Sequence, residues 1–260
     1  MKISGVEPGG GAQWGPLRCE RPPVEPPCSG AEHRAAFHAL GYRGAVRNVA
    51  HHEAAHSVTT ALQGLPIGQA RVGLTRAGLP NKPPAEDAEA FAKLGHIGLM
   101  IGSAVTPAWP RDTFAQTAND MRLIRKCAVT TAAGPMAERR TGFHTAYPYS
   151  AFSHREQCYS QLQHLREGMT FEEIHAEAET AIAQAEQVVE AAWTLITAVA
   201  TTLIEARQIE GLEVCRFILA AIENDPSLRA QLKALRLRGA WAARISPWKG
   251  AYYLDPEARS

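Results

Sequence analysis

The stretch from His51 to Gly64, HHEAAHSVTTALQG, decides our interpretation of this chain. Within it, residues 52–56 read His-Glu-Ala-Ala-His, an HExxH motif. Residues four apart lie on one face of a helix, so the rings of His52 and His56 can approach a single metal ion. The Glu53 carboxylate lies beside them, where it can reach a water on that ion. We therefore predict that His52 and His56 bind Zn²⁺ and that Glu53 is a catalytic general base.

The residues around the motif favour a helix from about Ala45 to Gln63. Most of its positions are apolar or helix-compatible, and Gly64 followed by Pro66 forms a stop signal. The alternative is a chance match on an ordinary amphipathic helix, and the helical context of the motif argues against a chance match. The adjacent His51 is rotated by about 100° around the helix, so we expect no ligation from it.

Composition sets the broad class of the protein. The chain has 260 residues, 45% of them hydrophobic and 20% charged, which is typical of one main globular domain. A net charge of +1 argues against a nucleic-acid binder. Five scattered cysteines without a CxxC pair indicate reduced thiols, and we find no signal core and no transmembrane segment. We expect a cytoplasmic protein.

Three regions follow from the composition along the chain. Residues 1–30 are rich in Pro and Gly and are predicted to be a disordered arm. Residues 31–222 carry the periodic patterns of the main domain. Residues 223–260 form a basic aromatic C-terminal extension, with six basic and no acidic residues between Pro226 and Leu254. A solvated basic face packed onto the core is the simpler interpretation, and a contact with a membrane surface, an acidic partner or RNA is the alternative.

A small β-structure is predicted beside the HExxH helix. Alternating apolar residues indicate a strand over Ile67 to Thr75, and Gly95 to Gly102 is a second candidate. The fold class we expect is therefore mainly α (α+β), with a small β-sheet or hairpin beside this helix. An edge strand there can bind an extended peptide by strand addition. A hairpin that only covers the core is the alternative.

Helical patterns dominate the rest of the main domain. Residues 113–140 are helical in pattern, with a break predicted at Gly134-Pro135. Residues 141–152 are predicted to be a loop. A helix then begins at Ser153, with Glu156 three residues later as its capping partner.

A second capping signature, Thr170 with Glu173, opens a long helical region. A further short helix is expected after Glu210-Gly211, ending at Ile222. The long region carries an apolar stripe close to heptad spacing, which we interpret as a packing face, with the seam of a homo-oligomer as the alternative. The stripe consists of Ile182, Val189, Trp193, Ile196, Ala200 and Leu203.

The order of several segments resembles the peptidase domain of FtsH-type proteases, which are ATP-dependent zinc endopeptidases. The segments are HHEAAHSVTTALQGLP from residue 51, ARVGLT from 70, AAGPMAERR (132–140), SAFSHREQC (150–158) and EGLEVCRFI (210–218). The resemblance covers roughly residues 45–222, and HExxH is its specific motif. It implies that residues 31–222 form a zincin-like, mainly helical peptidase domain.

A catalytic zinc needs a third protein ligand, and the extended HExxHxxGxxH form is absent. In the FtsH-type family this ligand is an Asp, and the resemblance places it at His154. Imidazole is acceptable there, because three-histidine zinc sites exist. The competing candidates are Glu156, Glu138 and Asp120. Glu156 has a role as the capping partner of Ser153, and Asp120 is most simply a surface residue. Glu138 can orient a ligand histidine or pair with a neighbouring arginine.

The function implied is a zinc metalloendopeptidase that hydrolyses peptide bonds in polypeptide substrates, with Glu53 as general base. The family's activity depends on ATP, but no GxxxxGK[ST] phosphate loop occurs in this sequence. We therefore expect cleavage of accessible peptides or dependence on a separate ATPase acting as unfoldase. The alternative is a catalytically inactive, FtsH-like zinc-binding or interaction module. The presence of Glu53 favours the enzyme, since metal binding alone does not require it.

Overall fold

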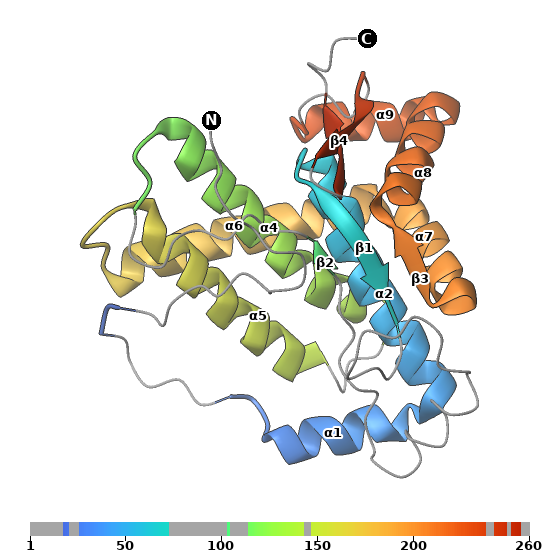
Figure 1. Cartoon of the computed structure of the whole chain (residues 1–260). Helices are drawn as coiled ribbons and strands as arrows, with labels where there is room; N and C mark the ends of the chain where they lie inside the picture. The colour runs from blue at the N-terminus through green and yellow to red at the C-terminus, as the bar shows by residue number, and fades with distance from the viewer. Residues whose placement is uncertain are drawn as a thin grey trace.

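The computed structural model describes residues 18–20, 26–72, 103–104, 114–142, 147–237, 242–248 and 251–255. These residues form a mainly helical fold with one small antiparallel sheet, which confirms the predicted α+β class. Figure 1 shows β1 lying along the long helix α2, and α4 also packs against this helix.

Two helices precede the first strand, and the strands of the single sheet come from both ends of the described chain, with most of the helices between them. Their bounds are α1 Gly30–Ala39, α2 Gly41–Leu62, β1 Ile67–Arg71, β2 Ser103–Ala104, α4 Ala118–Arg140, α5 Tyr147–Leu162, the 3-10 turn η1 Gln163–Leu165, α6 Phe171–Ala191, α7 Trp193–Ala206, β3 Gln208–Glu210, α8 Gly211–Asn224, α9 Pro226–Ala234, β4 Arg244–Trp248 and β5 Ala251–Asp255.

Helix α2 carries the HExxH motif and runs through the centre of the described fold. Nearly all of its side chains from Ala45 to Leu62 are buried, because α4, α7 and the sheet surround it. The predicted stop is confirmed: Gly64 has φ +69°, and the N–H groups of Gly64 and Leu65 donate to the carbonyls of Ala61 and Thr60. This is the hydrogen-bond pattern of a Schellman C-cap. The helix begins about one turn earlier than the sequence indicated.

Helix α4 does not break at Gly134-Pro135, so that prediction is wrong. Ala118–Arg140 is one helix with Pro135 inside it. An interior proline costs about 3 kcal/mol or more of helix stability. Burial of residues 127–138 against the neighbouring helices offsets that cost, and local propensity alone could not anticipate this packing. The helix begins at a capping box formed by Thr117 and Asp120, which gives Asp120 a structural role at the N-terminus.

The loop predicted for residues 141–152 and the capping box at Ser153 are also wrong in part. Helix α5 already includes Tyr147, so Ser153 and Glu156 lie inside it rather than at its start. A serine three residues before a glutamate caps a helix only where the chain enters it, and here the chain enters earlier. Residues 143–146 of the predicted loop lie outside the described residues.

The second capping box is confirmed. Thr170 and Glu173 exchange side-chain and backbone hydrogen bonds at the start of α6. The long region is divided at Ala192 into α6 and α7, which meet at an angle of 79°. Four residues of the predicted stripe, Val189, Ile196, Ala200 and Leu203, are buried in the core of this chain, which confirms a packing face.

The sheet has the strand order β2-β1-β5-β4, and β3 also pairs with β1. Strand β1 is antiparallel to its neighbours: Ile67 lies opposite Ala104 and Tyr252, and Ala70 lies opposite Ile209. Because β1 has partners on both sides, it is not the free edge that strand addition requires. The second predicted strand, Gly95 to Gly102, lies outside the described residues, and β2 directly follows it.

The C-terminal region packs onto the rest of the chain. Leu228 and Leu232 of α9 are buried, and β5 pairs with β1. Of the predicted arm over residues 1–30, the structure describes residues 18–20 and 26–30. The N–H of Arg18 donates to Oε1 of Gln163, and Ser29 caps α1. In the part of the chain that is described, no single helix is both long and apolar enough to cross a membrane, and only the bent pair α6 and α7 meets the length and composition criteria jointly.

Candidate metal centre

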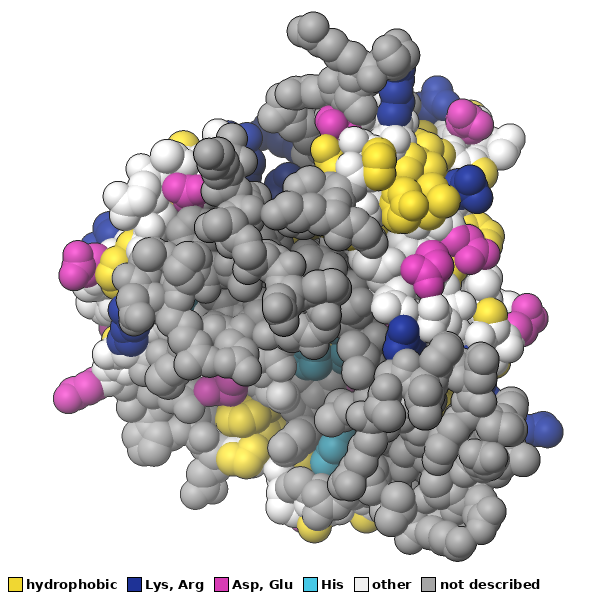
Figure 2. Space-filling model, in the orientation of Figure 1, with side chains coloured by type: hydrophobic (Ala, Val, Ile, Leu, Met, Phe, Trp, Pro, Cys, Tyr) yellow, Lys and Arg dark blue, Asp and Glu magenta, His cyan; other side chains and the backbone are white. Residues whose placement is uncertain are grey.

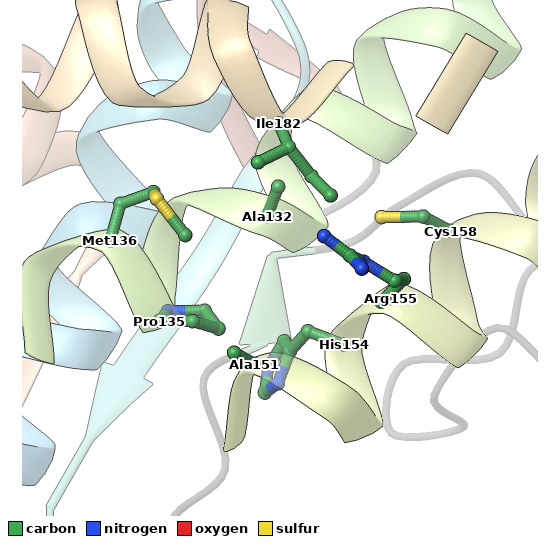
Figure 3. Close-up of a pocket in the computed structure, with 8 residues that line it drawn as sticks. All are labelled: Ala132, Pro135, Met136, Ala151, His154, Arg155, Cys158 and Ile182. Atoms are coloured by element: carbon green, nitrogen blue, oxygen red, sulfur yellow. The ribbon is translucent and has the colours of Figure 1, made fainter. Parts of the chain in front are cut away.

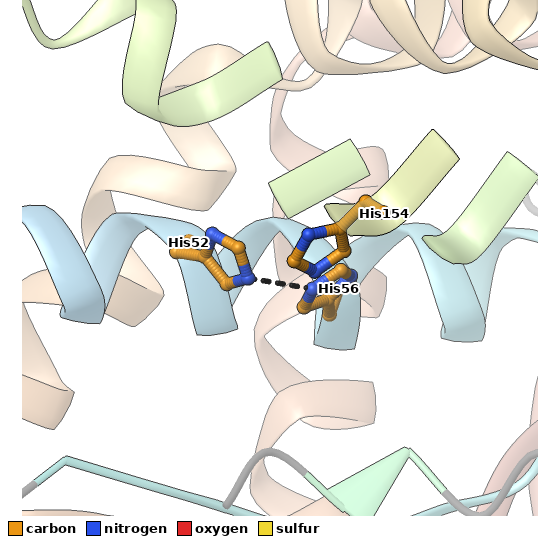
Figure 4. Close-up of side chains that lie close together, drawn as sticks. All are labelled: His52, His56 and His154. Atoms are coloured by element: carbon orange, nitrogen blue, oxygen red, sulfur yellow. Dashed lines mark hydrogen bonds between the residues drawn. The ribbon is translucent and has the colours of Figure 1, made fainter. Parts of the chain in front are cut away.

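Three histidine side chains lie close together, two from the middle of α2 and one from α5. The Nε2 atoms of His52 and His56 lie 2.9 Å apart, and one ligand atom from each of His52, His56 and His154 lies within 4.8 Å of the other two (Figure 4). The His154 ring centroid is 4.8 Å from that of His52 and 5.4 Å from that of His56. The spacing of the motif places the first two rings on one helical face, and α5 brings the third from a position about 100 residues further along the chain.

The second nitrogen of each ring fixes its tautomer. Nδ1 of His56 lies 2.7 Å from the carbonyl oxygen of Thr130, and Nδ1 of His154 lies 2.8 Å from that of Ser150. A carbonyl oxygen can only accept, so each Nδ1 carries the hydrogen and donates it. In a neutral ring the Nε2 atom then has no hydrogen and carries a lone pair, and this tautomer is the one whose Nε2 can bind a metal ion.

His52 has a carboxylate as its partner. Its Nδ1 donates to Oε1 of Glu138 at 2.8 Å, and both side chains are buried. The predicted contact of Glu138 with a histidine of the motif is therefore present. Burial lowers the pKa of His52, but the charge and hydrogen bond of Glu138 and the charge of Glu53 outweigh it, so the pKa is raised. Burial likewise favours a neutral Glu138, yet the charge of His52 and its hydrogen bond lower the pKa of this carboxyl.

The other two histidines are held neutral. Burial and the neighbouring charge of His52 lower the pKa of His56 well below its ordinary value. The same two causes lower the pKa of His154 to about 4. At neutral pH these two rings are therefore unprotonated, and each keeps the nitrogen lone pair that binding of a metal ion requires.

Glu53 lies next to the cluster, with Oε1 3.8 Å from Nε2 of His52. Its side chain is buried. Burial raises the pKa of Glu53 to about 7, with the charge of His52 opposing this shift and the charge of Glu138 adding to it. A carboxyl group with a pKa near the working pH is suited to general acid–base chemistry.

Gly134 of α4 leaves the space that an ion would need. A Cβ atom at this position would lie 2.5 Å from Nε2 of His56 and 2.6 Å from Nε2 of His52, so any side chain there would fill the gap beside the two nitrogens. Two nitrogens bound tetrahedrally to one zinc at about 2.0–2.1 Å lie about 3.3 Å apart, so the Nε2 atoms of His52 and His56, now 2.9 Å apart, would separate by about 0.4 Å to share the ion. The donor set, the tautomers and the cradle at Gly134 therefore fit a metal ion.

The competing candidates for the third position do not join the cluster. Asp120 caps α4 and receives the N–H groups of Gln116 and Thr117. Glu156 lies on α5 but is not part of the group of ligand atoms. His51 turns away as expected: its ring stacks on Trp193 at a centroid distance of 5.6 Å, and its Nδ1 donates to the carbonyl oxygen of Arg47.

The sequence did not reveal every part of this site. The carbonyl groups of Thr130 and Ser150 are backbone acceptors, which any residue type supplies, so no side-chain pattern marks them. Gly134 had a signal, since a glycine inside a helical pattern often marks a close approach, but we interpreted it as a break.

Histidine surface is visible in a recess of the face shown in Figure 2.

Comparison of the sequence with protein-family models gives no match, and comparison with curated proteins gives none either. Support for a site in this chain comes from the structure itself, which contains a three-histidine cluster that can hold a metal ion. The resemblance to FtsH-type peptidases rests on the sequence motifs alone.

Proposed function

We propose that the protein is a zinc metallopeptidase in which His52, His56 and His154 hold the ion and Glu53 is the general base. The observation that carries this proposal is the combination of three converging imidazoles with a buried carboxyl group 3.8 Å from one of them. Three neutral imidazoles with a remaining open position are a ligand set of catalytic rather than structural zinc.

The chain's own residues supply the rest of the chemistry. A zinc ion bound here would supply Lewis acidity, which acidifies a bound water and polarises a carbonyl group. Glu53 accepts the proton from the attacking water and later donates it to the leaving amine, so the carboxylate is regenerated in each turnover. Thr130 and Ser150 keep the rings of His56 and His154 in the metal-binding tautomer through their carbonyl groups.

Glu53 distinguishes a hydrolase from a module that only binds metal. A fourth side chain that is buried, acidic and not needed as a ligand costs desolvation free energy, so its presence favours a catalytic role. The resemblance of residues 45–222 to FtsH-type peptidases supports polypeptide as the substrate, and we extend the proposal to accessible, extended chains or to chains delivered by a separate unfoldase.

The test uses the zinc-loaded full chain with casein as substrate. We expect cleavage by the native protein and a loss of about 100-fold or more in Glu53→Gln, because general acid–base catalysis contributes about 10²–10⁴-fold. The zinc content of Glu53→Gln should stay at the native level. Glu213→Gln, an exposed glutamate on α8, is the matched control and should keep full activity. Stoichiometric zinc without cleavage of casein or of a mixed peptide pool would favour the inactive module.

A further inference from the structure

A pocket of about 40 Å³ lies between α4, α5 and α6, and His154 forms part of its wall (Figure 3). The same histidine belongs to the metal cluster, so the pocket begins where the cluster ends. The lining residues are Ala132, Pro135, Met136, Ala151, His154, Arg155, Cys158 and Ile182.

Helix α4 turns one face to the metal cluster and another to the pocket, whereas α5 uses one face for both. On α4, Gly134 faces the rings of His52 and His56, whereas the next residue, Pro135, faces the pocket. On α5, the lining residues recur at the i, i+3, i+4 and i+7 positions of one helical face, starting at Ala151. His154 therefore connects the pocket with the metal cluster.

The chemistry of the lining is that of a site for an aliphatic group. The side chains of Met136 and Ile182 and those of the alanines and the proline are apolar, and Figure 3 shows them arranged around the cavity. The thiol of Cys158 donates to the carbonyl oxygen of Ala128, so it offers no free polar group to a ligand. The guanidinium of Arg155 is paired with Glu179 at 3.0 Å, and 42% of the Arg155 side chain is exposed, which places it at the rim.

The size of the pocket limits its occupant. A water molecule needs about 10–15 Å³ of this kind of volume, so the pocket has room for about three waters or for a branched side chain of about three or four carbons. An aromatic ring exceeds this space. Peptidase pockets of this kind distinguish substrates by fit, and one methylene too many or too few changes the specificity constant by about 10- to 200-fold.

We propose that this pocket receives a short aliphatic side chain of the substrate, of valine or leucine size, next to the bond that is cleaved. The inference rests on the proposed peptidase function and adds a substrate class to it. Ile182 becomes the specificity-determining residue, since it closes the pocket from α6 and lies outside the metal cluster.

The first test compares cleavage sites in a mixed peptide pool, identified by mass spectrometry, for the native protein and two variants. Ile182→Ala should widen the preference to Phe and Met by about 10-fold or more, and Ile182→Phe should shift it to Ala and Gly. Leu219→Ala, a partly buried aliphatic residue on α8, is the matched control and should leave the preference unchanged. Cleavage with the same side-chain preference in all variants would overturn the proposal that this pocket receives a substrate side chain.

The second test measures binding rather than turnover. In Glu53→Gln, a fluorescent peptide with Leu at the tested position should bind about 10-fold or more tightly than its Gly counterpart, and the difference should vanish in Glu53→Gln with Ile182→Phe. Equal binding of both peptides to Glu53→Gln would overturn the pocket. Discrimination in binding without any cleavage by the native protein would instead support the pocket and overturn the peptidase function.

Discussion

The two faces of α4 that carry charged side chains differ in how far those side chains are exposed to water. Towards α2, Gly134 and Glu138 meet the rings of His52 and His56 in a buried setting. Towards α6, three arginines form exposed ion pairs with glutamates one helix away; these pairs are Arg125–Glu177, Arg139–Glu186 and Arg140–Glu190. Bulk water readily replaces an exposed partner but poorly replaces a buried one, so the positions of the partner atoms matter more on the first face than on the second.

The largest effect is expected from closing the gap at Gly134. In Gly134→Ala the new Cβ would lie within 2.6 Å of both Nε2 atoms, so the rings must move and the space for the ion is lost. We expect zinc affinity to fall by more than about 100-fold, beyond the usual effect of losing a supporting contact. Competition with a chromophoric chelator measures this.

Gly44→Ala is the matched control, because it lies on α2 about two turns before His52, and among the described residues its new Cβ would approach only Leu40. Its zinc affinity should match that of the native protein. Native affinity in Gly134→Ala would show that the ion does not bind beside the two rings.

The next effect follows from removing the charge of Glu138. Glu138→Gln keeps an oxygen acceptor for Nδ1 of His52 but removes the negative charge that makes the ring a stronger ligand. Zinc affinity should fall by about 10- to 100-fold. Glu190→Gln changes an exposed glutamate paired with α4 and should change affinity little. Equal affinities in the two variants would remove the functional difference between the faces.

The pH dependence of zinc binding sharpens the description of the buried face. The raised pKa of His52 means that the metal-free protein keeps a proton on this ring to higher pH than usual, and zinc must displace it. His56 and His154, with lowered pKa values, do not compete until the solution is more acidic. Affinity should therefore fall with decreasing pH, by about tenfold per pH unit, as one proton is displaced near pH 6.

The measurement is made with the Glu53→Gln variant, because Glu53, with a pKa of about 7, would otherwise add a second proton to the number released when zinc binds. Isothermal titration in buffers of different ionisation enthalpy counts the protons released. Two or more protons per zinc near pH 6 would mean that the histidines titrate independently, with no pre-formed cluster.

The smallest effect is expected on the exposed face. Arg125 and Glu177 are 49% and 27% exposed, and solvent screens their attraction. A double-mutant cycle with Arg125→Ala and Glu177→Ala, read from urea unfolding, should give a coupling free energy of about 0.2–1 kcal/mol. Zinc affinity should stay at the native level. A coupling above about 2 kcal/mol would show that the exposed pair resembles a buried one.

The same distinction explains what the sequence could predict. The motif at residues 52–56, the stop at Gly64 and the capping box at Thr170 are local patterns, and the structure shows each of them as expected. The position of His154 in the cluster came from a resemblance in segment order, since no local spacing connects it to α2.

The errors concern features that depend on contacts between distant segments. The unbroken course of α4 through Pro135 depends on its burial against α2, α5 and α6. The early start of α5 depends on where the chain enters the helix, which a capping pattern at Ser153 did not reveal. The pairing of β5 with β1 joins residues about 185 positions apart, a contact that strand patterns alone do not specify.

The central claim is that one ion is held jointly by His52, His56 and His154. The most direct measurement is zinc stoichiometry and affinity, by equilibrium dialysis with metal analysis, for the native chain and the three single alanine variants. We predict one zinc per native chain and a loss of binding of about 100-fold or more in each variant, His154→Ala included. Native binding in His154→Ala, or no zinc in the native protein after reconstitution, would contradict the account.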